Sequence, residues 1–184
     1  MENIIGIGTL LISDPFLKDP NFLRTAVLVC ENQPEGSFGF VLNKPQEHVL
    51  GDLIEDLYGN NFPVYFGGPV QTNTLHFLHQ CPELITGGVE ITKGIYWGGD
   101  FVDVINLLLR QELKPHQIRF FVGYSGWGKG QLQAEIDSKS WILTECSKKL
   151  LFGTAPENTW KEALQELGGE YQRMVNYPLD PQYN

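Results

Sequence analysis

The segment at residues 25–43 constrains the fold of this chain more than any other. Residues 26–31 are rich in β-branched side chains and residues 38–43 form a second apolar run, a pattern typical of two strands. Between them, residues 32–36 contain a proline and a glycine, which favour turns. The pattern predicts an antiparallel hairpin with a longer, glycine-containing loop.

The rest of the chain alternates short apolar runs with helical patterns. Twenty glycines and eleven prolines favour many tight turns over a helical bundle. Apolar residues at helical spacing, with Asp100 as an N-cap and Gly168-Gly169 as a stop, predict short covering helices. The expected fold is α+β, a compact mixed, largely antiparallel sheet with a few covering helices. The expected strands are residues 8–13, 26–31, 38–43, 64–66, 75–79, 118–122 and 141–144, and the expected helices are residues 50–57, 101–108, 131–136 and 156–167.

The length of the chain predicts a single domain. Its 184 residues fall within the usual size of one domain, and no linker or low-complexity segment divides them. We expect one domain over residues 1–184, with a core at residues 6–168 and a loose C-terminal tail at residues 169–184.

The charge of the chain disfavours unassisted binding to nucleic acid. The formal net charge is -9 and the isoelectric point is about 4.8, so the protein repels a phosphate backbone. Lys148 and Lys149 are the only adjacent basic pair, and the sequence shows no compact basic stripe.

Cysteine usage and the N-terminal residues predict a cytoplasmic protein. Cys30, Cys81 and Cys146 are odd in number and widely spaced, as expected for reduced thiols in a reducing compartment. Residues 1–5 lack a basic region before their apolar residues, and the apolar runs are too short to cross a bilayer. We therefore expect no membrane insertion.

The glycine-rich segment at residues 123–130 resembles two catalytic motifs without matching either. It has the spacing of a phosphate-binding loop, but Gly130 stands where Ser or Thr would bind magnesium. Ser125 has the position of a nucleophile, yet Trp127 replaces the small residue that lets the nucleophile elbow turn. We favour turn glycines and predict no catalytic residue, which inclines us against an enzyme.

His76, His79 and Cys81 are close enough in sequence to suggest a metal site. If residues 75–79 form a strand, the two histidines point to opposite faces and cannot chelate one ion. Cys30 alternates with Leu28 on an apolar face, as a buried inert thiol would. We therefore predict neither a metal nor a cofactor.

Several aromatic residues lie at or near glycine turns, where strand or helix packing alone would not place them. They suggest a shared pocket, although we favour packing over the side-chain-less glycines. These residues are Tyr65, Phe66, Tyr96, Trp97, Tyr124 and Trp127.

Separated motifs, in order, resemble the AlgH/YqgE family of bacterial proteins. The resemblance spans about residues 6–168 and is far more specific than any single glycine loop. Lys44, Lys129 and Ser125 depart from the family pattern, where Arg, Pro and Ala are expected. The motifs are Gly8-Thr-Leu-Leu-Ile-Ser-Asp-Pro15, Asp19-Pro20-x-Phe22-x-Arg24, Gly36-Ser-Phe-Gly-Phe-Val-Leu-Asn-Lys-Pro45, Phe66-Gly-Gly-Pro-Val70, Gly123-Tyr-Ser-Gly-Trp-x-x-Gly-Gln-Leu132 and Ser140-Trp141.

The resemblance implies a compact α+β fold with its own topology, a cytosolic setting and no established biochemical activity. Some members of the family are labelled transcriptional regulators. The departures at Lys129 and Ser125 argue against a family-wide chemical role for either side chain.

Three hypotheses for the function follow. The preferred one is a non-enzymatic binding or regulatory module that meets a protein or small-molecule partner where residues 43–45, 67–69 and 123–131 converge. The alternative is a small-molecule-binding protein or enzyme with Arg24, Asn43, Tyr124 and Gln131 in a pocket, and the weaker one is a regulator contacting DNA. The candidate binding residues are Arg24, Asn43, Pro45, Gly67, Gly68, Pro69, Gly123, Tyr124, Gly126, Trp127 and Gln131.

Overall fold

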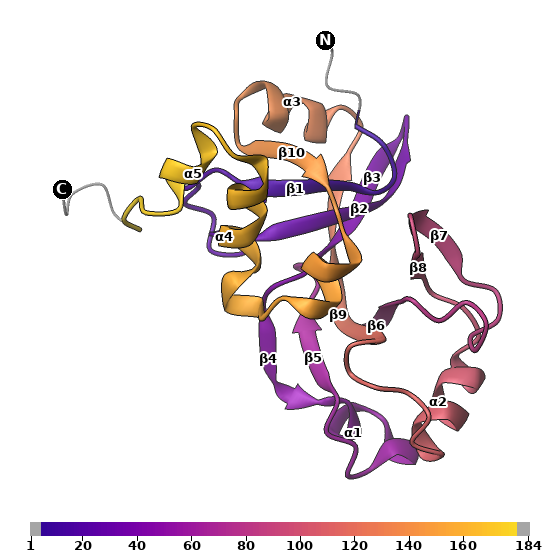
Figure 1. The fold of residues 1–184 in the computed structure, drawn as a ribbon. Coiled ribbons are helices and arrows are strands. Elements are labelled where there is room, and N and C mark those ends of the chain that lie inside the picture. Colours follow the sequence, from indigo (N-terminus) through magenta and orange to yellow (C-terminus); the bar gives the residue numbers. More distant parts are fainter. Residues whose placement is uncertain (1–4, 180–184) are drawn as a thin grey trace.

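The computed structural model describes residues 5–179 and confirms the α+β class (Figure 1). The predictions for residues 1–4 and 180–184 lie outside the described residues. The strands are β1 (Thr9–Ser13), β2 (Ala26–Gln33), β3 (Gly36–Val41), β4 (Pro45–Val49), β5 (Pro63–Phe66), β6 (Val70–His79), β7 (Val89–Thr92), β8 (Ile95–Trp97), β9 (Ile118–Gly128) and β10 (Trp141–Glu145). The helices are α1 (Leu50–Leu53), α2 (Phe101–Leu109), α3 (Gln131–Asp137), α4 (Pro156–Leu167), α5 (Tyr171–Met174), the 3-10 helix η1 (Glu55–Leu57) and the π-helix η2 (Lys149–Gly153).

One curled sheet contains all the strands of the described chain, and β9 is its central member. The path through the sheet is β10-β1-β2-β3-β9-β6-β8-β7, with β4 and β5 attached to the side through β9. Every pairing is antiparallel except that of β5 with β9. Gly8, just before β1, packs against the backbone oxygen of Ile91 in β7, so the curl brings the far end of the path back to β1.

The predicted hairpin is confirmed, with a tighter turn than expected. Gln33 pairs with Gly36, which leaves only Pro34 and Glu35 in the loop. The register shifts between Val29 and Glu31, and such a bulge increases the local twist of a strand. The strands therefore extend through most of the segment that the sequence assigned to the turn.

Two expectations about element boundaries were wrong. The glycine-rich segment after residue 122 is not a loop, because β9 continues to Gly128 by pairing with β3. The helix predicted at residues 50–57 is split into α1 and η1, since Ile54 has an extended backbone (φ -128°, ψ 114°). Both differences come from tertiary pairing and packing, which local periodicity does not report.

The described part of the C-terminal tail is packed against the domain, in contrast to the loose tail expected from composition. It contains α5, and Tyr171 and Met174 pack on the core. Tyr177 stacks on Phe16 with 5.4 Å between ring centroids. The aromatic residues of this segment therefore add apolar contacts to the fold.

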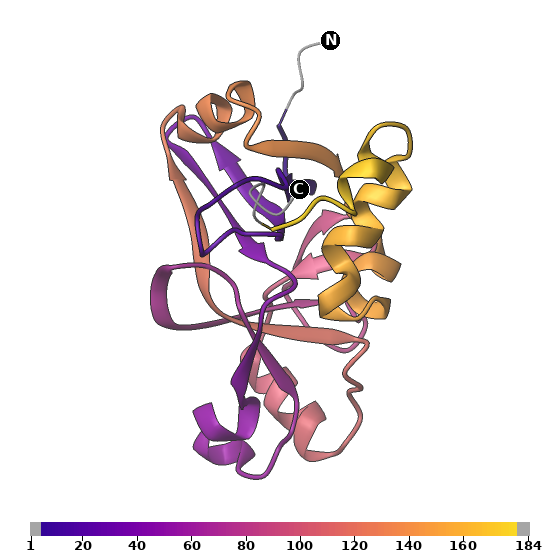
Figure 2. The ribbon, with the colours of Figure 1, turned by 90° about the vertical axis from the view of Figure 1, so that its left-hand side faces the viewer.

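Alternation along the strands divides the core between the two faces of the sheet. Leu10, Leu28, Phe40 and Phe121 belong to a cluster on one face, which α4 and η2 cover (Figures 1 and 2). Their sequence neighbours face the other side, where α3 covers one half and α2 with η1 covers the other. The sheet therefore packs apolar side chains on both of its faces.

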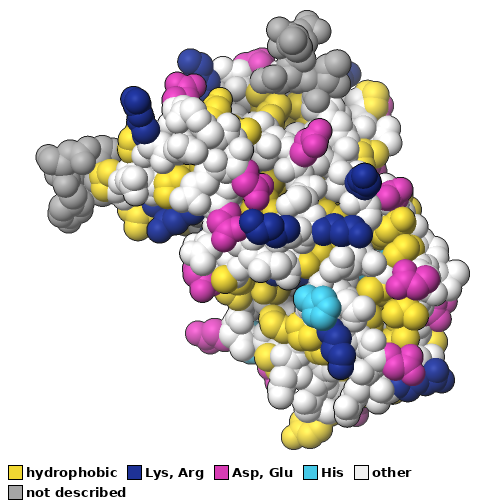
Figure 3. Space-filling model, in the orientation of Figure 1, with side chains coloured by type: hydrophobic (Ala, Val, Ile, Leu, Met, Phe, Trp, Pro, Cys, Tyr) yellow, Lys and Arg dark blue, Asp and Glu magenta, His cyan; other side chains and the backbone are white. Residues whose placement is uncertain are grey.

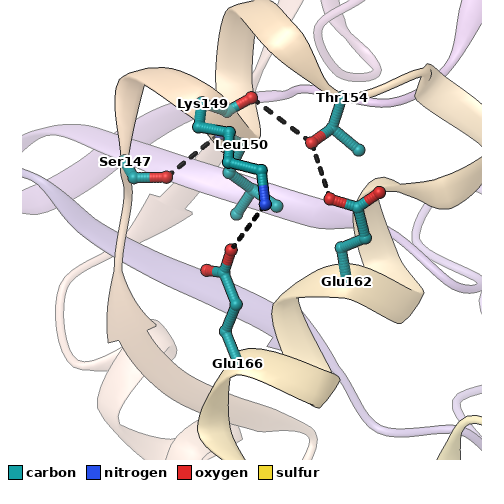
Figure 4. A network of polar contacts seen from close by, with 6 residues as sticks. All are labelled: Ser147, Lys149, Leu150, Thr154, Glu162 and Glu166. Atoms are coloured by element: carbon teal, nitrogen blue, oxygen red, sulfur yellow. Dashed lines mark hydrogen bonds and ion pairs between the residues drawn. The ribbon is translucent and has the colours of Figure 1, made fainter.

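Helix α4 is attached to the sheet by a buried indole and by a small polar network. Trp160 is fully buried and its Nε1–H donates to Ser13 O at 2.9 Å. Two side chains before α4 also reach the helix: the Thr154 hydroxyl donates to Glu162 Oε2 at 2.9 Å, and Lys149 Nζ lies 4.0 Å from Glu166 Oε1 (Figure 4). The ion pair is exposed and contributes little, so the attachment depends mainly on buried side chains such as Trp160, Ala163 and Leu164.

The helix boundaries predicted from caps are largely confirmed. The Asp100 carboxylate accepts from Val102 N at 2.8 Å at the start of α2, and Gly168 ends α4.

Within residues 5–179, no helix combines the length and apolar character needed to cross a membrane.

Candidate functional site

The glycine motifs predicted to form one surface do meet, at a crossing of the β5–β6 connection with β9. Gly67 N donates to Val122 O at 2.9 Å, and the Ser125 hydroxyl donates back to Gly67 O at 3.0 Å. A methyl group on Gly68 would lie 2.1 Å from the Tyr124 carbonyl carbon, and one on Gly123 would lie 2.5 Å from Gly68 O. This crossing is filled by backbone, so its glycines leave no room for a ligand.

An open cleft of about 740 Å³ lies beside this crossing, between β3, β9, β6 and β8. Phe38, Trp97 and Tyr124 form an aromatic wall and are all half-buried. The Phe38 ring centroid lies 4.9 Å from that of Trp97 and 5.7 Å from that of Tyr124, both with edge-to-face geometry. The lining residues are Glu31, Gln33, Glu35, Gly36, Ser37, Phe38, Val70, His76, Trp97, Tyr124, Gly126 and Trp127.

The curl of the sheet creates this cleft. Phe38 in β3 and Trp97 in β8 are separated by β9 and β6 in the strand order, yet their rings touch. The β2–β3 and β7–β8 hairpins therefore lie on the same side of the molecule, as Figure 1 shows. The cleft combines these rings with the carboxylates of Glu31 and Glu35, contributed by β2 and the hairpin turn.

His76 of β6 is one of the polar side chains that line the cleft. Its Nε2 lies 2.9 Å from the Thr74 hydroxyl, and its ring lies 5.2 Å from Phe40 and 6.0 Å from Tyr124. Burial lowers the pKa of His76, so the ring is neutral at pH 7. The aromatic wall is thus extended by an uncharged imidazole.

The sequence-predicted site residues divide between the cleft and other places. Tyr124, Gly126 and Trp127 line it. The remaining candidates do not line this cleft: Arg24, Asn43, Pro45, Gly67, Gly68, Pro69, Gly123 and Gln131. Whether the candidates bind a partner stays a prediction.

Arg24 and Asn43 hold the backbone at the start of β2. Asn43 Nδ2 donates to Arg24 O at 3.0 Å, and its Oδ1 accepts from Ala26 N at 3.0 Å. The Arg24 backbone is left-handed (φ 50°), and its guanidinium lies 4.7 Å from the Trp160 ring centroid and donates to Tyr177 O. These contacts give both side chains a structural role.

Trp127 and Gln131 are likewise engaged within the fold. Trp127 is 5% exposed, and its Nε1–H donates to Glu135 Oε2 at 2.9 Å. The Gln131 side chain accepts from Gly128 N at 3.0 Å, which helps to start α3. Pro45 and Pro69 are exposed and outside the cleft.

The nucleophile candidates are sealed in the interior. Ser125 is fully buried and donates to a backbone oxygen. Cys30, Cys81 and Cys146 are buried free thiols, and burial raises the pKa of each, in Cys146 to about 12. Neutral, buried thiols are poor nucleophiles.

The histidine pair of β6 takes up opposite sides of the sheet, as the strand assignment predicts. His79 is fully buried, with Nε2 3.0 Å from Gly98 O and Nδ1 accepting from Cys81 N at 3.2 Å. Both ring nitrogens are therefore occupied, which suits the neutral Nε2–H tautomer. Within residues 5–179, no group of His, Cys, Asp and Glu is arranged to hold a metal ion.

We predict that these histidines make the fold less stable in mild acid. Burial lowers the pKa of His79 and of His76, whereas a histidine in the unfolded chain takes up a proton near its ordinary pKa of about 6.5. The unfolded state therefore binds more protons as the pH falls below about 6.5, and stability declines. Urea unfolding at pH 7.5 and 5.5 measures the effect.

The matched variants are His79→Gln and, as a control at an exposed ring, His116→Gln. The loss of stability on acidification should be smaller in His79→Gln and unchanged in His116→Gln. An unchanged loss in a variant lacking both His76 and His79 would contradict the assignment.

The sequence singled out two of the three rings of the aromatic wall. Trp97 and Tyr124 were among the aromatic residues noted near glycines, whereas Tyr65, Phe66 and Tyr96 do not line this cleft. Phe38, Glu31 and Glu35 were not proposed as site residues. The sequence around these residues shows the alternation of apolar and polar side chains that any half-buried strand shows. Nothing in that pattern indicates that the sheet curls into a cleft there.

A family model and the sequences of known proteins point to the same family. A model of the AlgH-like family matches residues 10–172. A UPF0301 protein of Chlorobium luteolum is 41% identical over 180 residues, covering 98% of this chain and 95% of the relative. A UPF0301 protein of Cytophaga hutchinsonii is 38% identical over 178 residues, covering 96% of this chain and 98% of the relative.

Two solved structures share the fold. The solution structure of the AlgH protein from Pseudomonas aeruginosa has a TM-score of 0.71 and 26% identity, covering 97% of this chain and 98% of that one. The crystal structure of protein DIP2367 from Corynebacterium diphtheriae has a TM-score of 0.77 at 17% identity, covering 96% of this chain and 95% of that one. The resemblance indicated by the sequence motifs is confirmed.

Proposed function

This chain belongs to the AlgH-like family, and from that premise we propose that it is a non-enzymatic binding module whose aromatic cleft receives a positively charged apolar or aromatic group of its partner. The observation that carries the proposal is the composition of the cleft. Half-buried aromatic rings stand beside carboxylates in a space of about 740 Å³. Ligand pockets usually combine an apolar wall with a few charged groups that set orientation.

The charges and rings of the cleft favour a cation. Glu31 and Glu35 line it, and none of its lining residues within the described chain is Lys or Arg. The faces of tryptophan and tyrosine rings attract a cation that approaches within about 6 Å. A cation that enters the cleft would therefore gain from the carboxylates and from the rings of Trp97 and Tyr124 together.

The surroundings of the cleft support binding over catalysis or contact with DNA. The nearby hydroxyl of Ser125 is buried and hydrogen-bonded within the fold. The carboxylates of the cleft would repel a phosphate backbone, and Figure 3 shows acidic and basic side chains interspersed on the face it draws. The free thiols support the cytoplasmic setting that we propose with this function.

A pair of probes with equal shape and opposite charge tests the proposal. We predict that 2-phenylethylammonium binds the cleft at least about fivefold more tightly than 3-phenylpropionate, because an ion pair and a cation–π contact each contribute about 1 kcal/mol. Titration followed by amide and indole N–H chemical shifts measures both affinities. The shifts of Phe38, Trp97 and Tyr124 should change first.

Variants locate the effect. Trp97→Ala should weaken binding of the ammonium probe by about tenfold, and Glu35→Gln by about threefold. Glu47→Gln in β4 removes an exposed charge outside the cleft and should leave the affinity unchanged. Equal affinities for the two probes, or equal binding by all variants, would refute the cleft as a cation site.

A further inference from the structure

A buried cation lies in the core at the opposite end of β9. Arg119 is 7% exposed and occupies a central strand, paired with Leu78 of β6. By alternation it shares its sheet face with Phe121, whereas Phe120 faces α2. A charge is retained at such a place only if something compensates the loss of its hydration.

The protein satisfies only part of the Arg119 guanidinium. Nη1 donates to Leu42 O at 3.0 Å, and the guanidinium carbon lies 4.4 Å from the Tyr65 ring centroid. Within residues 5–179, the close contacts between basic and acidic side chains are His48–Asp52 and Lys149–Glu166, so no described carboxylate neutralises Arg119.

The neighbouring Cys146 does not supply the missing negative charge. Burial raises the pKa of the Cys146 thiol to about 12, and the nearby Arg119 charge offsets only part of that rise. The thiol is therefore neutral at pH 7, whereas a guanidinium stays protonated there. Arg119 thus faces the interior as a cation whose compensation is incomplete.

The free edge of the guanidinium opens onto a cavity. Arg119 lines a space of about 310 Å³ with Pro63, Tyr65, Pro115, His116, Ile118 and Phe152. Within residues 5–179, Arg24 Nε is the one buried side-chain nitrogen or oxygen that lacks a hydrogen-bond partner. Nε and Nη2 of Arg119 are therefore not shut off from solvent. Nε–H and Nη2–H point in parallel along one edge of the guanidinium, the geometry that binds an oxyanion through two hydrogen bonds.

We propose that this cavity is an oxyanion site in which Arg119 binds the carboxylate or phosphate group of a small ligand through Nε and Nη2. Leu42 O and the Tyr65 ring fix the guanidinium, while Phe152 and Ile118 provide an apolar wall for the body of the ligand. The exposed His116 also lines the cavity. The site is separate from the aromatic cleft and takes the opposite charge.

Titration of the full chain with defined anions tests the site, with the Arg119 Nε–H resonance as readout. The probes are benzoate, phenyl phosphate and inorganic phosphate, with uncharged benzamide and KCl at matched ionic strength as controls. We expect saturable shifts with the oxyanions only. Saturation by phosphate alone would identify the free ion as the ligand type, and tighter binding of the phenyl compounds would identify an organic acid.

Variants separate the site from general electrostatics. Arg119→Met should weaken anion binding at least tenfold, and Arg119→Lys should also weaken it, because an ammonium lacks the parallel donors. Arg110→Met, at an exposed arginine, should bind as the parent does. If Arg119→Met does not fold, the affinity of Arg119→Lys and the response of the Arg119 Nε–H resonance in the parent protein still show whether oxyanions bind at Arg119.

Two results would overturn the proposal. One is an Arg119 resonance that responds no more to the oxyanions than to KCl. The other is unchanged affinity in a folded Arg119 variant.

Discussion

Replacing Gly68 with alanine should remove a large share of the stability of the domain. Gly68 has φ +155°, and an alanine methyl group would lie 2.1 to 2.2 Å from the Tyr124 carbonyl and Ser125 N. Those atoms belong to β9, the central strand, so they cannot move without breaking the sheet. The expected cost exceeds about 4 kcal/mol, a large share of the about 5–15 kcal/mol that stabilises a typical domain.

The matched control is Gly59→Ala, which separates backbone strain from collision. Gly59 also has a positive φ of +83°, but no atom lies within 4 Å of the added methyl group. Its cost should be about 1–2 kcal/mol. Urea unfolding followed by circular dichroism compares the two, and equal stabilities would show that the crossing is not close-packed.

The second large effect is expected from Trp127→Ala, at a residue that the sequence nominated for binding. Its indole and that of Trp141 both donate to Glu135 Oε2, at 2.9 and 2.8 Å, and the two rings pack edge to face. Removing a buried tryptophan typically costs about 3–5 kcal/mol. We therefore expect a shift of the urea midpoint to much lower denaturant, with near-ultraviolet dichroism lost in the same transition.

A companion variant tests the shared carboxylate. Glu135→Gln keeps the shape of the side chain but weakens both indole hydrogen bonds, and it should cost about 1–3 kcal/mol. If Trp127→Ala were as stable as the parent, the indole would not be part of the core. Trp127 would then be free to serve the cleft as a binding residue.

The elements that the sequence predicted well are those decided by local chemistry. The cap at Asp100, the stop at Gly168 and the hairpin around Pro34 depend on residues only a few positions apart. The continuation of β9 to Gly128 depends on pairing with β3, which lies about ninety positions earlier. Composition alone indicated turns there, because glycine is ordinarily rare inside strands.

The candidate site was harder to predict for the same reason. Its wall joins Phe38, Trp97 and Tyr124 from three strands, and only the curl of the sheet brings them together. The glycine motifs lie at the crossing next to the cleft, and three of the candidate residues they suggested, Tyr124, Gly126 and Trp127, line the cleft itself. Arg119 could have been recognised from the sequence, because it lies within an apolar strand and a buried charge there requires compensation.

The arrangement of the two sites suggests that one strand serves both. β9 carries Arg119 near its start and Tyr124 just past its middle, where the strand meets the glycine crossing. The aromatic cleft is acidic and the Arg119 site is basic, so each would select a ligand group of the opposite charge.

A crystal structure of the protein with 2-phenylethylammonium tests the central claim most directly. We predict density for the probe in the cleft, with its ammonium within about 6 Å of the Trp97 or Tyr124 ring and facing Glu31 or Glu35. A probe that binds elsewhere, or that lies in the cleft with its ammonium directed away from these rings and carboxylates, would contradict the account.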